Sequence, residues 1–257
     1  MKQMITVTAW RRPQYLKQVL ESIVAADPKE FEIAIAADAI APEVTHPEIH
    51  DVVKQIAEEN KELHWHLIGN QQNLGVRGNP FQALKYAFDI MGRDYVVYLE
   101  EDTPIAPDAL HVARWYIEQK LAEKDPKLLC LNLFNYESDP SRPTEFFYGD
   151  KFSALGLVIT ANQWENFFKK YWMDDEISHR AWGKKSVGWD WSLHGAMKVL
   201  GLHSLSPRLI RSNHIGRLGG VHASADFHDK TFPHLEVSTH TERLDYVVEQ
   251  PSHDGAE

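Results

Sequence analysis

Short apolar strands alternate with amphipathic helices along the first hundred residues, and this alternation constrains the fold more than any other feature of the sequence. The expected strands cover residues 4–9, 31–37, 63–68 and 95–99, and the expected helices cover residues 13–25, 47–60 and 80–91. A β-α-β-α order produces a mostly parallel sheet with helices on both faces. We therefore expect an α/β fold built on such a sheet.

Three acidic residues, Glu100, Glu101 and Asp102, follow the expected strand 95–99 directly. Like charges ~4 Å apart repel by roughly 1 kcal/mol in water and by ~4 kcal/mol at an effective dielectric of about 20, so a bridging divalent cation would relieve the cluster. Ligands of open α/β sheets bind beyond the carboxyl ends of the strands, where a hard cation would present a phosphorylated substrate. The alternative is a solvated turn in which Asp102 caps a helix that begins near residue 107.

Other polar residues are expected at the same sheet edge. Ala9, Arg11 and Arg12 stand at or just after the end of the first strand, and Asp38 follows the second. Because parallel strands end at one edge, these groups should converge with the acidic cluster.

The loop 70–79 precedes the next helix and contains Asn73, Gly75, Arg77 and Asn79. Its glycines allow close approach of the backbone to a ligand, the unpaired N–H groups of a helix start attract an anion, and Arg77 adds a positive charge. The loop matches neither the Walker motif nor the dinucleotide fingerprint. A plain strand-to-helix turn would use the same residue types.

Asp190 lies between Trp189 and Trp191 at the start of an expected helix 189–200. Bulky aromatic neighbours exclude water and raise the basicity of a carboxylate, which suits a general base for a hydroxyl group. The alternative is an ordinary first-turn residue that the helix dipole stabilises.

The late segment 211–222 combines Arg211, Arg217, His214 and His222 with several glycines. This composition suits a loop that closes over a diphosphate, and either histidine could complete the metal site that the acidic cluster begins. Each histidine is also compatible with a plain hydrogen-bonding role.

The charge of the chain bears on its partners. With 37 acidic and 27 basic residues, the formal net charge of −10 disfavours nucleic acid. Only a patch that gathered Lys184, Lys185, Arg208, Arg211 and Arg217 would favour it. A single cysteine, no signal segment and no apolar run of 18 residues lead us to expect a cytoplasmic protein without a membrane anchor.

Taken in order, these motifs resemble the A-type (GT-A fold) nucleotide-sugar glycosyltransferases, and among them the N-acetylglucosaminyltransferase I family. The likeness spans about residues 5–224, and its most specific part runs from Val97 to Asp108, similar to the family's Glu-Asp-Asp followed by Ala-Pro-Asp. It implies a Rossmann-like, mostly parallel central sheet with helices on both faces and a smaller C-terminal acceptor-side region. We expect one domain over residues 1–250, with a nucleotide-binding half at 1–105, an acceptor-binding half at 106–250 and a disordered tail at 251–257.

The resemblance also implies roles for the candidate residues. Asp102 would hold the metal that bridges the donor diphosphate, and Asp190 would be the catalytic base. From the residues themselves, the oxygen-rich site favours Mn²⁺ or Mg²⁺, and His214 is the candidate further ligand. Asp38 would contact the uracil, and Glu100 and Glu101 would contact the ribose, the sugar or metal-bound water. The full set expected to bind the nucleotide sugar is Ala9, Arg11, Arg12, Asp38, Asn73, Gly75, Arg77, Asn79, Glu100, Glu101, Arg211 and Arg217.

The function expected from the sequence is a metal-dependent, inverting hexosyl- or N-acetylhexosaminyltransferase. It would move a sugar from a nucleoside diphosphate, UDP first, to a hydroxyl of a saccharide or another acceptor. One alternative is a retaining transferase, in which Asp190 only orients the acceptor. Another is a transferase that modifies DNA bases. A third alternative is a catalytically silent module that binds nucleotide sugars or glycans.

Overall fold

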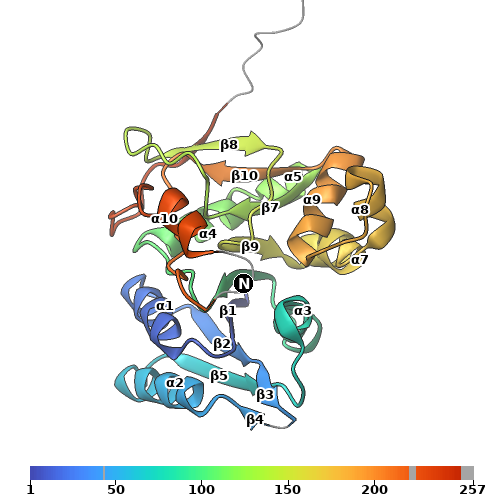
Figure 1. The fold of residues 1–257 in the computed structure, drawn as a ribbon. Helices are drawn as coiled ribbons and strands as arrows, with labels where there is room; N and C mark the ends of the chain where they lie inside the picture. Colours follow the sequence, from blue (N-terminus) through green and yellow to red (C-terminus); the bar gives the residue numbers. More distant parts are fainter. Residues whose placement is uncertain (43, 220–223, 250–257) are drawn as a thin grey trace, which may run out of the picture.

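The computed structural model describes residues 1–42, 44–219 and 224–249. A nine-stranded sheet in the order β11-β8-β10-β7-β9-β6-β1-β2-β5 forms its centre, with helices on both faces (Figure 1). Its strands are β1 (Gln3–Ala9), β2 (Phe31–Ala37), β5 (His64–Gly69), β6 (Tyr95–Glu100), β7 (Leu128–Asn132), β8 (Glu145–Gly149), β9 (Leu157–Thr160), β10 (His203–Pro207) and β11 (Val247–Val248), and β3 (Ala39–Ala41) pairs with β4 (Val44–Thr45) in a separate ribbon. The helices are α1 (Pro13–Ala25), α2 (Pro47–Glu59), α3 (Gly75–Lys85), η1 (Tyr86–Ile90), α4 (Ala109–Glu118), α5 (Leu121–Lys124), α6 (Ala161–Gln163), η2 (Trp164–Phe168), α7 (Lys169–Tyr171), α8 (Asp175–Trp182), α9 (Trp189–Leu200) and α10 (Ala225–Thr231).

The sheet is mostly parallel, as the alternating pattern predicts. Strands β5, β2, β1 and β6 pair parallel to one another, and β7 with β10 and β8 with β11 are also parallel. Strand β9 pairs antiparallel with β6 and β7, and β8 pairs antiparallel with β10. The register places Ala9 opposite Ala37 and Thr8 opposite Glu100, so β1, β2 and β6 end together.

The central strands are buried on both faces. In β6, Tyr95, Val97 and Leu99 pack into a core with α1, α2 and α4, whereas Val96 and Tyr98 pack into a second core with α3, η2 and α9. Burial on both faces explains why this strand reads as a continuous apolar run and not as an alternating one.

Several boundaries differ from the prediction. Helix α3 begins at Gly75 and not at Pro80, because the Asp38 carboxylate accepts hydrogen bonds from the N–H groups of Leu74 and Gly75 and so caps the helix from a distant strand. The single helix expected after residue 107 is broken at Lys120, which has a φ of 52°. Strand β10 and helices α8 and α10 were not predicted, since all three are short.

Three further expectations concern the residues outside the described ranges, the two halves of the domain and the membrane. His222 and the tail 251–257 lie outside the described residues. Strands from before and after residue 105 belong to the same sheet. The division into a nucleotide-binding and an acceptor-binding half stays a prediction. In the described part of the chain, the helices are too short or too polar to cross a bilayer.

Arg211 corrects the predicted role of the late segment. Its side chain is fully buried and pairs with the equally buried Asp108, with 3.1 Å between Nη2 and Oδ2. It also donates to the carbonyls of Leu209 and Pro143. A buried carboxylate requires a buried counter-charge, so Arg211 stabilises the fold and does not contact a diphosphate.

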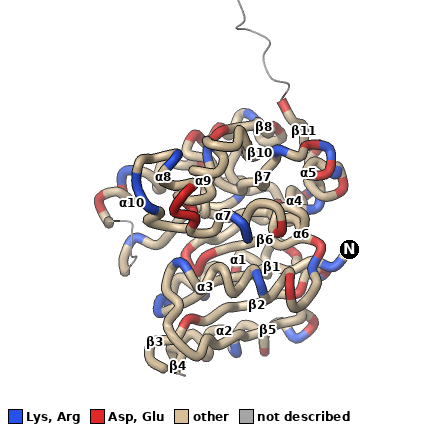
Figure 2. Tube along the Cα trace, turned by 90° about the vertical axis from the view of Figure 1, so that its right-hand side faces the viewer, with Lys and Arg blue, Asp and Glu red and all other residues tan. Residues whose placement is uncertain are grey.

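The basic patch considered from the sequence does not form. Arg208 pairs with Glu249, Arg217 pairs with Asp229, and Arg211 lies in the core. In the view of Figure 2, lysine and arginine alternate with aspartate and glutamate over the molecule. The structure therefore adds no support for a nucleic-acid partner.

Arg211→Leu should lower the free energy of unfolding by about 3–5 kcal/mol, because Asp108 would be left buried without its partner. Urea denaturation measures this difference. Arg217→Leu is the matched control, since its ion pair with Asp229 is exposed to solvent and screened, so that stability should barely change. Equal, small effects of the two substitutions would contradict the structural role of Arg211.

Candidate active site

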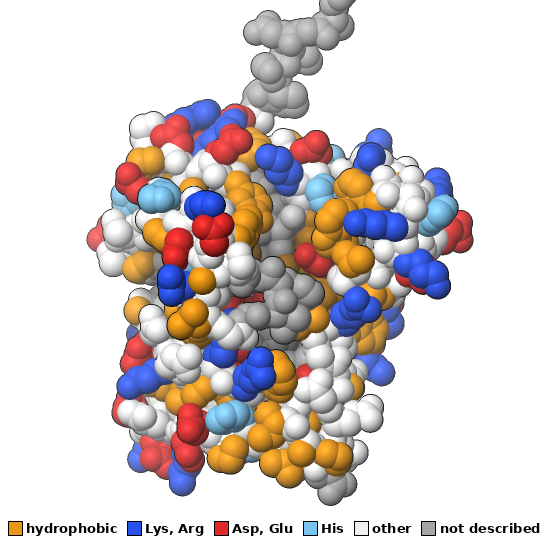
Figure 3. Space-filling view, in the orientation of Figure 1, with side chains coloured by type: hydrophobic (Ala, Val, Ile, Leu, Met, Phe, Trp, Pro, Cys, Tyr) orange, Lys and Arg blue, Asp and Glu red, His pale blue; other side chains and the backbone are white. Residues whose placement is uncertain are grey.

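A cavity of about 630 Å³ opens at the carboxyl ends of β1, β2 and β6, a volume within the range of ~300–1,000 Å³ common for small-molecule sites. On this side of the molecule the surface is hollowed between the α10 and the α8–α9 regions (Figure 3). The predicted residues that line the cavity are Ala9, Arg12, Asp38, Asn73, Gly75, Asn79, Glu100, Glu101, Asp102, Asp190 and His214. The structure thus brings most of the sequence candidates to one place.

Asp102 is buried at the base of this cavity. Its Oδ2 atom lies 2.7 Å from Nη1 of Arg12 and 3.2 Å from Nε2 of His214, while its Oδ1 atom has no hydrogen-bond partner among the described residues. Burial alone would raise the pKa of Asp102, but the contacts with His214 and Arg12 outweigh it and hold the pKa below its ordinary value. Asp102 therefore presents an ionised carboxylate with one free oxygen.

Both carboxylate oxygens of Glu101 accept hydrogen bonds from within the protein. Its Oε2 accepts hydrogen bonds from the backbone N–H of Trp10 at 2.8 Å and of Arg12 at 3.4 Å, and its Oε1 accepts from Nε of Arg12 at 2.6 Å. These contacts hold the loop between β1 and α1 against the end of β6. The geometry favours a positioning role for Glu101 over the expected contact with ribose or sugar.

Glu100 is half-buried beside Asp102. Its Oε1 accepts a hydrogen bond from the hydroxyl of Tyr98 at 3.2 Å, and that hydroxyl also lies 3.2 Å from Oγ1 of Thr8. Burial, together with the negative charges of Asp102 and Asp190, raises the pKa of Glu100 to about 8. In the ligand-free protein Glu100 is therefore largely protonated near neutral pH.

Asp38 shapes the loop that precedes α3. Oδ1 accepts from the N–H of Leu74 at 2.9 Å and from Nδ2 of Asn70 at 3.1 Å, and Oδ2 accepts from the N–H of Gly75 at 2.7 Å. Gly75 has a φ of 65°, which favours glycine. Asp38 faces the cavity as predicted, but most of its hydrogen-bonding capacity serves the loop, which weakens the case for a contact with uracil.

Two asparagines complete this wall. Nδ2 of Asn73 donates to the carbonyl of Ala39 at 2.7 Å, and the buried Asn79 donates to the carbonyl of Ala36 at 3.1 Å while its Oδ1 accepts from Asn70 at 2.9 Å. Both side chains fix the backbone that surrounds the cavity.

Asp190 lies in the first turn of α9 and also lines the cavity. No hydrogen bond or ion pair of its carboxylate is formed with the described residues, and a Cβ on Gly188 would stand only 2.4 Å from its Oδ1. Trp189 is buried, stacks on Trp172 at a centroid distance of 4.6 Å and meets the ring of Tyr98 edge-on at 5.7 Å. The second flanking tryptophan, 40% exposed, turns outward, so aromatic shielding of Asp190 comes from one side only.

Besides the buried Arg211, three predicted residues do not line the cavity. The exposed Arg11 stacks over the ring of Trp10 at 4.0 Å, Arg77 donates to the carbonyl of Val187 at 2.7 Å, and Arg217 forms two hydrogen bonds with Asp229. Each arginine has found an acceptor or an aromatic face within the protein, which the sequence spacing did not reveal.

His214 is confirmed as a neighbour of the acidic cluster. Its ring packs against Phe232 at a centroid distance of 4.7 Å and against His228 at 5.5 Å, and its Nδ1 is buried without a hydrogen-bond partner among the described residues. A Cβ on Gly216 would lie 2.0 Å from Oδ2 of Asp102, so only glycine lets this segment pass so close to the carboxylate.

Other lining residues were missed. They include Trp10, Tyr136, Phe152, Ser153, Phe227 and Phe232. Isolated aromatic residues in loops give no periodic signal, and only the fold shows that they face a shared cavity.

The residues present fit a divalent cation in part. Asp102 and His214 offer an oxygen with no partner and a nearby imidazole, a donor set that suits Mn²⁺ or Mg²⁺ with further oxygens from a ligand. Across residues 1–42, 44–219 and 224–249, no group of three or more His, Cys, Asp or Glu residues forms a complete site. A cation here would therefore depend on a phosphorylated ligand for its remaining ligands.

Comparison with known proteins identifies the family. The model of "Glycosyl transferase family 2" matches residues 4–141. Comparison with curated protein sequences finds no significant match. None of the proteins named here is an N-acetylglucosaminyltransferase I, so that narrower resemblance stays a prediction.

Among solved structures, one supports the fold. The mannosyltransferase PcManGT from Pyrobaculum calidifontis, solved in complex with GDP-Man and Mn²⁺, matches with a TM-score of 0.50 and 17% identity, over 80% of this chain and 54% of that one. The glycosyltransferase GlyE of Streptococcus pneumoniae TIGR4 matches with a TM-score of 0.46 and 15% identity, over 80% of this chain and 45% of its own. The chain thus spans about half the length of these two structures.

Metal-free protein should lose stability as the pH rises from about 4.5 to about 8. Native Glu100 keeps its proton up to about pH 8, whereas in the unfolded chain it ionises near its ordinary pKa of 4.5, so the native state binds more protons in this window. Glu100→Gln, which is neutral throughout, should flatten this part of the profile. Urea unfolding in EDTA at several pH values measures it, and parallel profiles of the two proteins would refute the raised pKa.

Proposed function

We propose, on the premise that this chain belongs to glycosyl transferase family 2, that it is a metal-dependent, inverting glycosyltransferase that uses a nucleoside-diphosphate sugar. One observation carries the proposal: the carboxylates of Asp102 and Asp190 come from distant parts of the chain and line one cavity at the carboxyl ends of the strands. Asp102 suits the donor, and Asp190 suits the acceptor.

On the donor side, Asp102 and His214 would hold Mn²⁺ or Mg²⁺. The cation would stabilise the negative charge of the diphosphate as it departs. Arg12, fixed by Glu101 and Asp102, adds a permanent positive charge at the same end of the cavity. UDP is the first nucleotide to test, and GDP is the second because the mannosyltransferase of similar fold was solved with GDP-Man and Mn²⁺.

On the acceptor side, Asp190 is the base. Its carboxylate has no partner in the described residues and therefore remains free to accept a proton from the acceptor hydroxyl. As that proton leaves, the hydroxyl oxygen forms a bond to the anomeric carbon and the bond from this carbon to the diphosphate breaks. Attack opposite to the leaving group inverts the configuration; in a retaining enzyme Asp190 would orient the acceptor, and the anomer of the product distinguishes the two.

The donor site can be tested by thermal shift with UDP and GDP, each with and without Mn²⁺. A nucleotide at 100 times its dissociation constant stabilises the native state by about 2.7 kcal/mol. We expect stabilisation that needs Mn²⁺ and is lost in Asp102→Asn, while Asp226→Asn, an exposed control on α10, behaves like the unmodified protein. Absence of any nucleotide response in the unmodified protein would contradict the proposal.

Asp190→Asn should separate binding from catalysis. Loss of the base should reduce kcat by ~10²–10⁴-fold and leave the Mn²⁺-dependent binding of nucleotide unchanged. Release of UDP from a UDP-sugar, with and without added acceptor, measures turnover, and the thermal shift with UDP and Mn²⁺ measures binding. Full activity of this variant would exclude Asp190 as the base, and a protein that binds nucleotide sugars without any turnover would be the silent module considered from the sequence.

A further inference from the structure

A second cavity of about 500 Å³ adjoins the first. It lies over β7, β8 and β10, in the part of the sheet that the donor-side residues do not reach. Tyr136, Phe152 and Ser153 line both cavities, so the two spaces meet at these side chains. The two cavities are therefore neighbours that share part of their walls.

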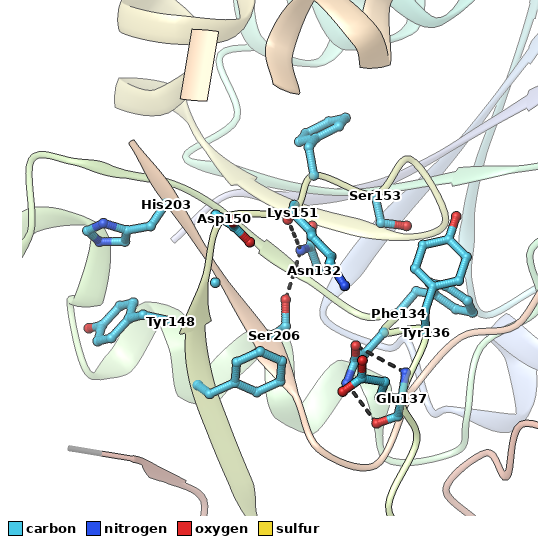
Figure 4. Close-up of a pocket in the computed structure, with 14 residues that line it drawn as sticks. Asn132, Phe134, Tyr136, Glu137, Tyr148, Asp150, Lys151, Ser153, His203 and Ser206 are labelled. Atoms are coloured by element: carbon cyan, nitrogen blue, oxygen red, sulfur yellow. Dashed lines mark hydrogen bonds between the residues drawn. The ribbon is translucent and has the colours of Figure 1, made fainter. Parts of the chain in front are cut away.

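The second cavity extends away from the shared residues. Figure 4 shows Tyr136 and Ser153 at one end, Tyr148 and His203 at the other, and Asp150 and Lys151 between them. The ring of Tyr148 packs edge-on against His203 at 4.9 Å, and Nε2 of His203 lies 2.6 Å from Oδ2 of Asp125, so this far end is well fixed.

The floor of the cavity is a satisfied polar network. Nδ2 of the buried Asn132 donates to the carbonyl of Lys151 at 3.2 Å and to Oγ of Ser206 at 2.9 Å (Figure 4). The hydroxyl of Ser204 donates to the same carbonyl at 2.7 Å. These groups shape the cavity and leave recognition to the side chains above them.

The walls combine aromatic faces with unpaired polar groups. Tyr136 and Tyr148 are 47% and 38% exposed, so both rings are available to a ligand. The carboxylates of Glu137 and Asp150 and the ammonium of Lys151 form no ion pair with other described residues. Aromatic faces receive the apolar C–H faces of sugar rings, and carboxylates accept hydrogen bonds from hydroxyl groups.

The shared end of this cavity lies next to the base. Tyr136 and Asp190 both line the first cavity, and partial burial and then the negative charge of Asp190 raise the pKa of the Tyr136 hydroxyl. An acceptor hydroxyl at Asp190 would therefore continue past Tyr136 into the second cavity.

We propose that the second cavity binds the acceptor, and that this acceptor is a neutral glycan of at least two sugar units. The unit that receives the new sugar lies at Asp190, and the preceding unit lies between Tyr136 and Tyr148. Two carboxylates against one ammonium disfavour an anionic chain such as a nucleic acid or a polyphosphate. This inference rests on the proposed transferase function and adds the class of its acceptor.

The test uses saturation-transfer NMR on the full chain with UDP and Mn²⁺ present. The probes are cellobiose, maltose, lactose, mannobiose and N,N′-diacetylchitobiose, each compared with its monosaccharide. We expect at least one disaccharide to bind more tightly than its monosaccharide. Tyr148→Ala should weaken this binding about tenfold, or about 1.4 kcal/mol. The matched variant Tyr148→Phe, which keeps the ring, should retain it.

The outcomes separate this inference from the function beneath it. Mn²⁺-dependent binding of UDP or GDP with no bound disaccharide would overturn the glycan acceptor and leave the donor site intact. Disaccharide binding that survives Tyr148→Ala, with the melting temperature unchanged, would place the glycan elsewhere and overturn the assignment. Failure to bind any nucleotide would overturn the proposed function and this inference with it.

Discussion

The arrangement of the cavity depends on one arginine between two carboxylates. The guanidinium of Arg12 lies 2.6 Å from Oε1 of Glu101 and 2.7 Å from Oδ2 of Asp102, at a place where burial would otherwise make adjacent negative charges unfavourable. The three acids at the end of β6 divide accordingly: Glu101 orients the β1–α1 loop, the pKa of Asp102 is lowered, and the pKa of Glu100 is raised to about 8. Similar residues in sequence thus have different chemical states because their partners differ.

The sequence sufficed for the parallel half of the sheet and for the centre of the site. Bounds such as Phe31–Ala37 and Pro13–Ala25 follow from apolar periods and a helix-start proline, which are local signals. Asp102 and Asp190 could be placed because strand ends and helix starts converge in this type of fold. The acidic cluster does line the cavity, but Arg12 and the raised pKa of Glu100 relieve its charge, so the bridging cation expected from the sequence stays a proposal.

What the sequence could not predict were side-chain partners across long separations. Arg211 seemed suited to a phosphate, yet its partner Asp108 lies 103 residues earlier in the chain and both are buried. Asp38 seemed suited to a contact with the uracil ring, yet it caps a helix that begins 37 residues later. Neither pairing leaves a trace in local composition. The same holds for Tyr136, whose place between two cavities arises only when β7, β8 and α9 are assembled.

The edge-on contact of Tyr98 with Trp189 links the strand that leads to Asp102 with the helix that carries Asp190. Tyr98 precedes Glu100 by two positions in β6, and Trp189 directly precedes Asp190 in α9. The spacing between the acids at the end of β6 and Asp190 is therefore set inside the second hydrophobic core and not by surface loops. Packed cores resist deformation. Sequence divergence toward new acceptors would therefore fall on residues 135–144 and 150–153, while the separation of Asp102 and Asp190 stays constant.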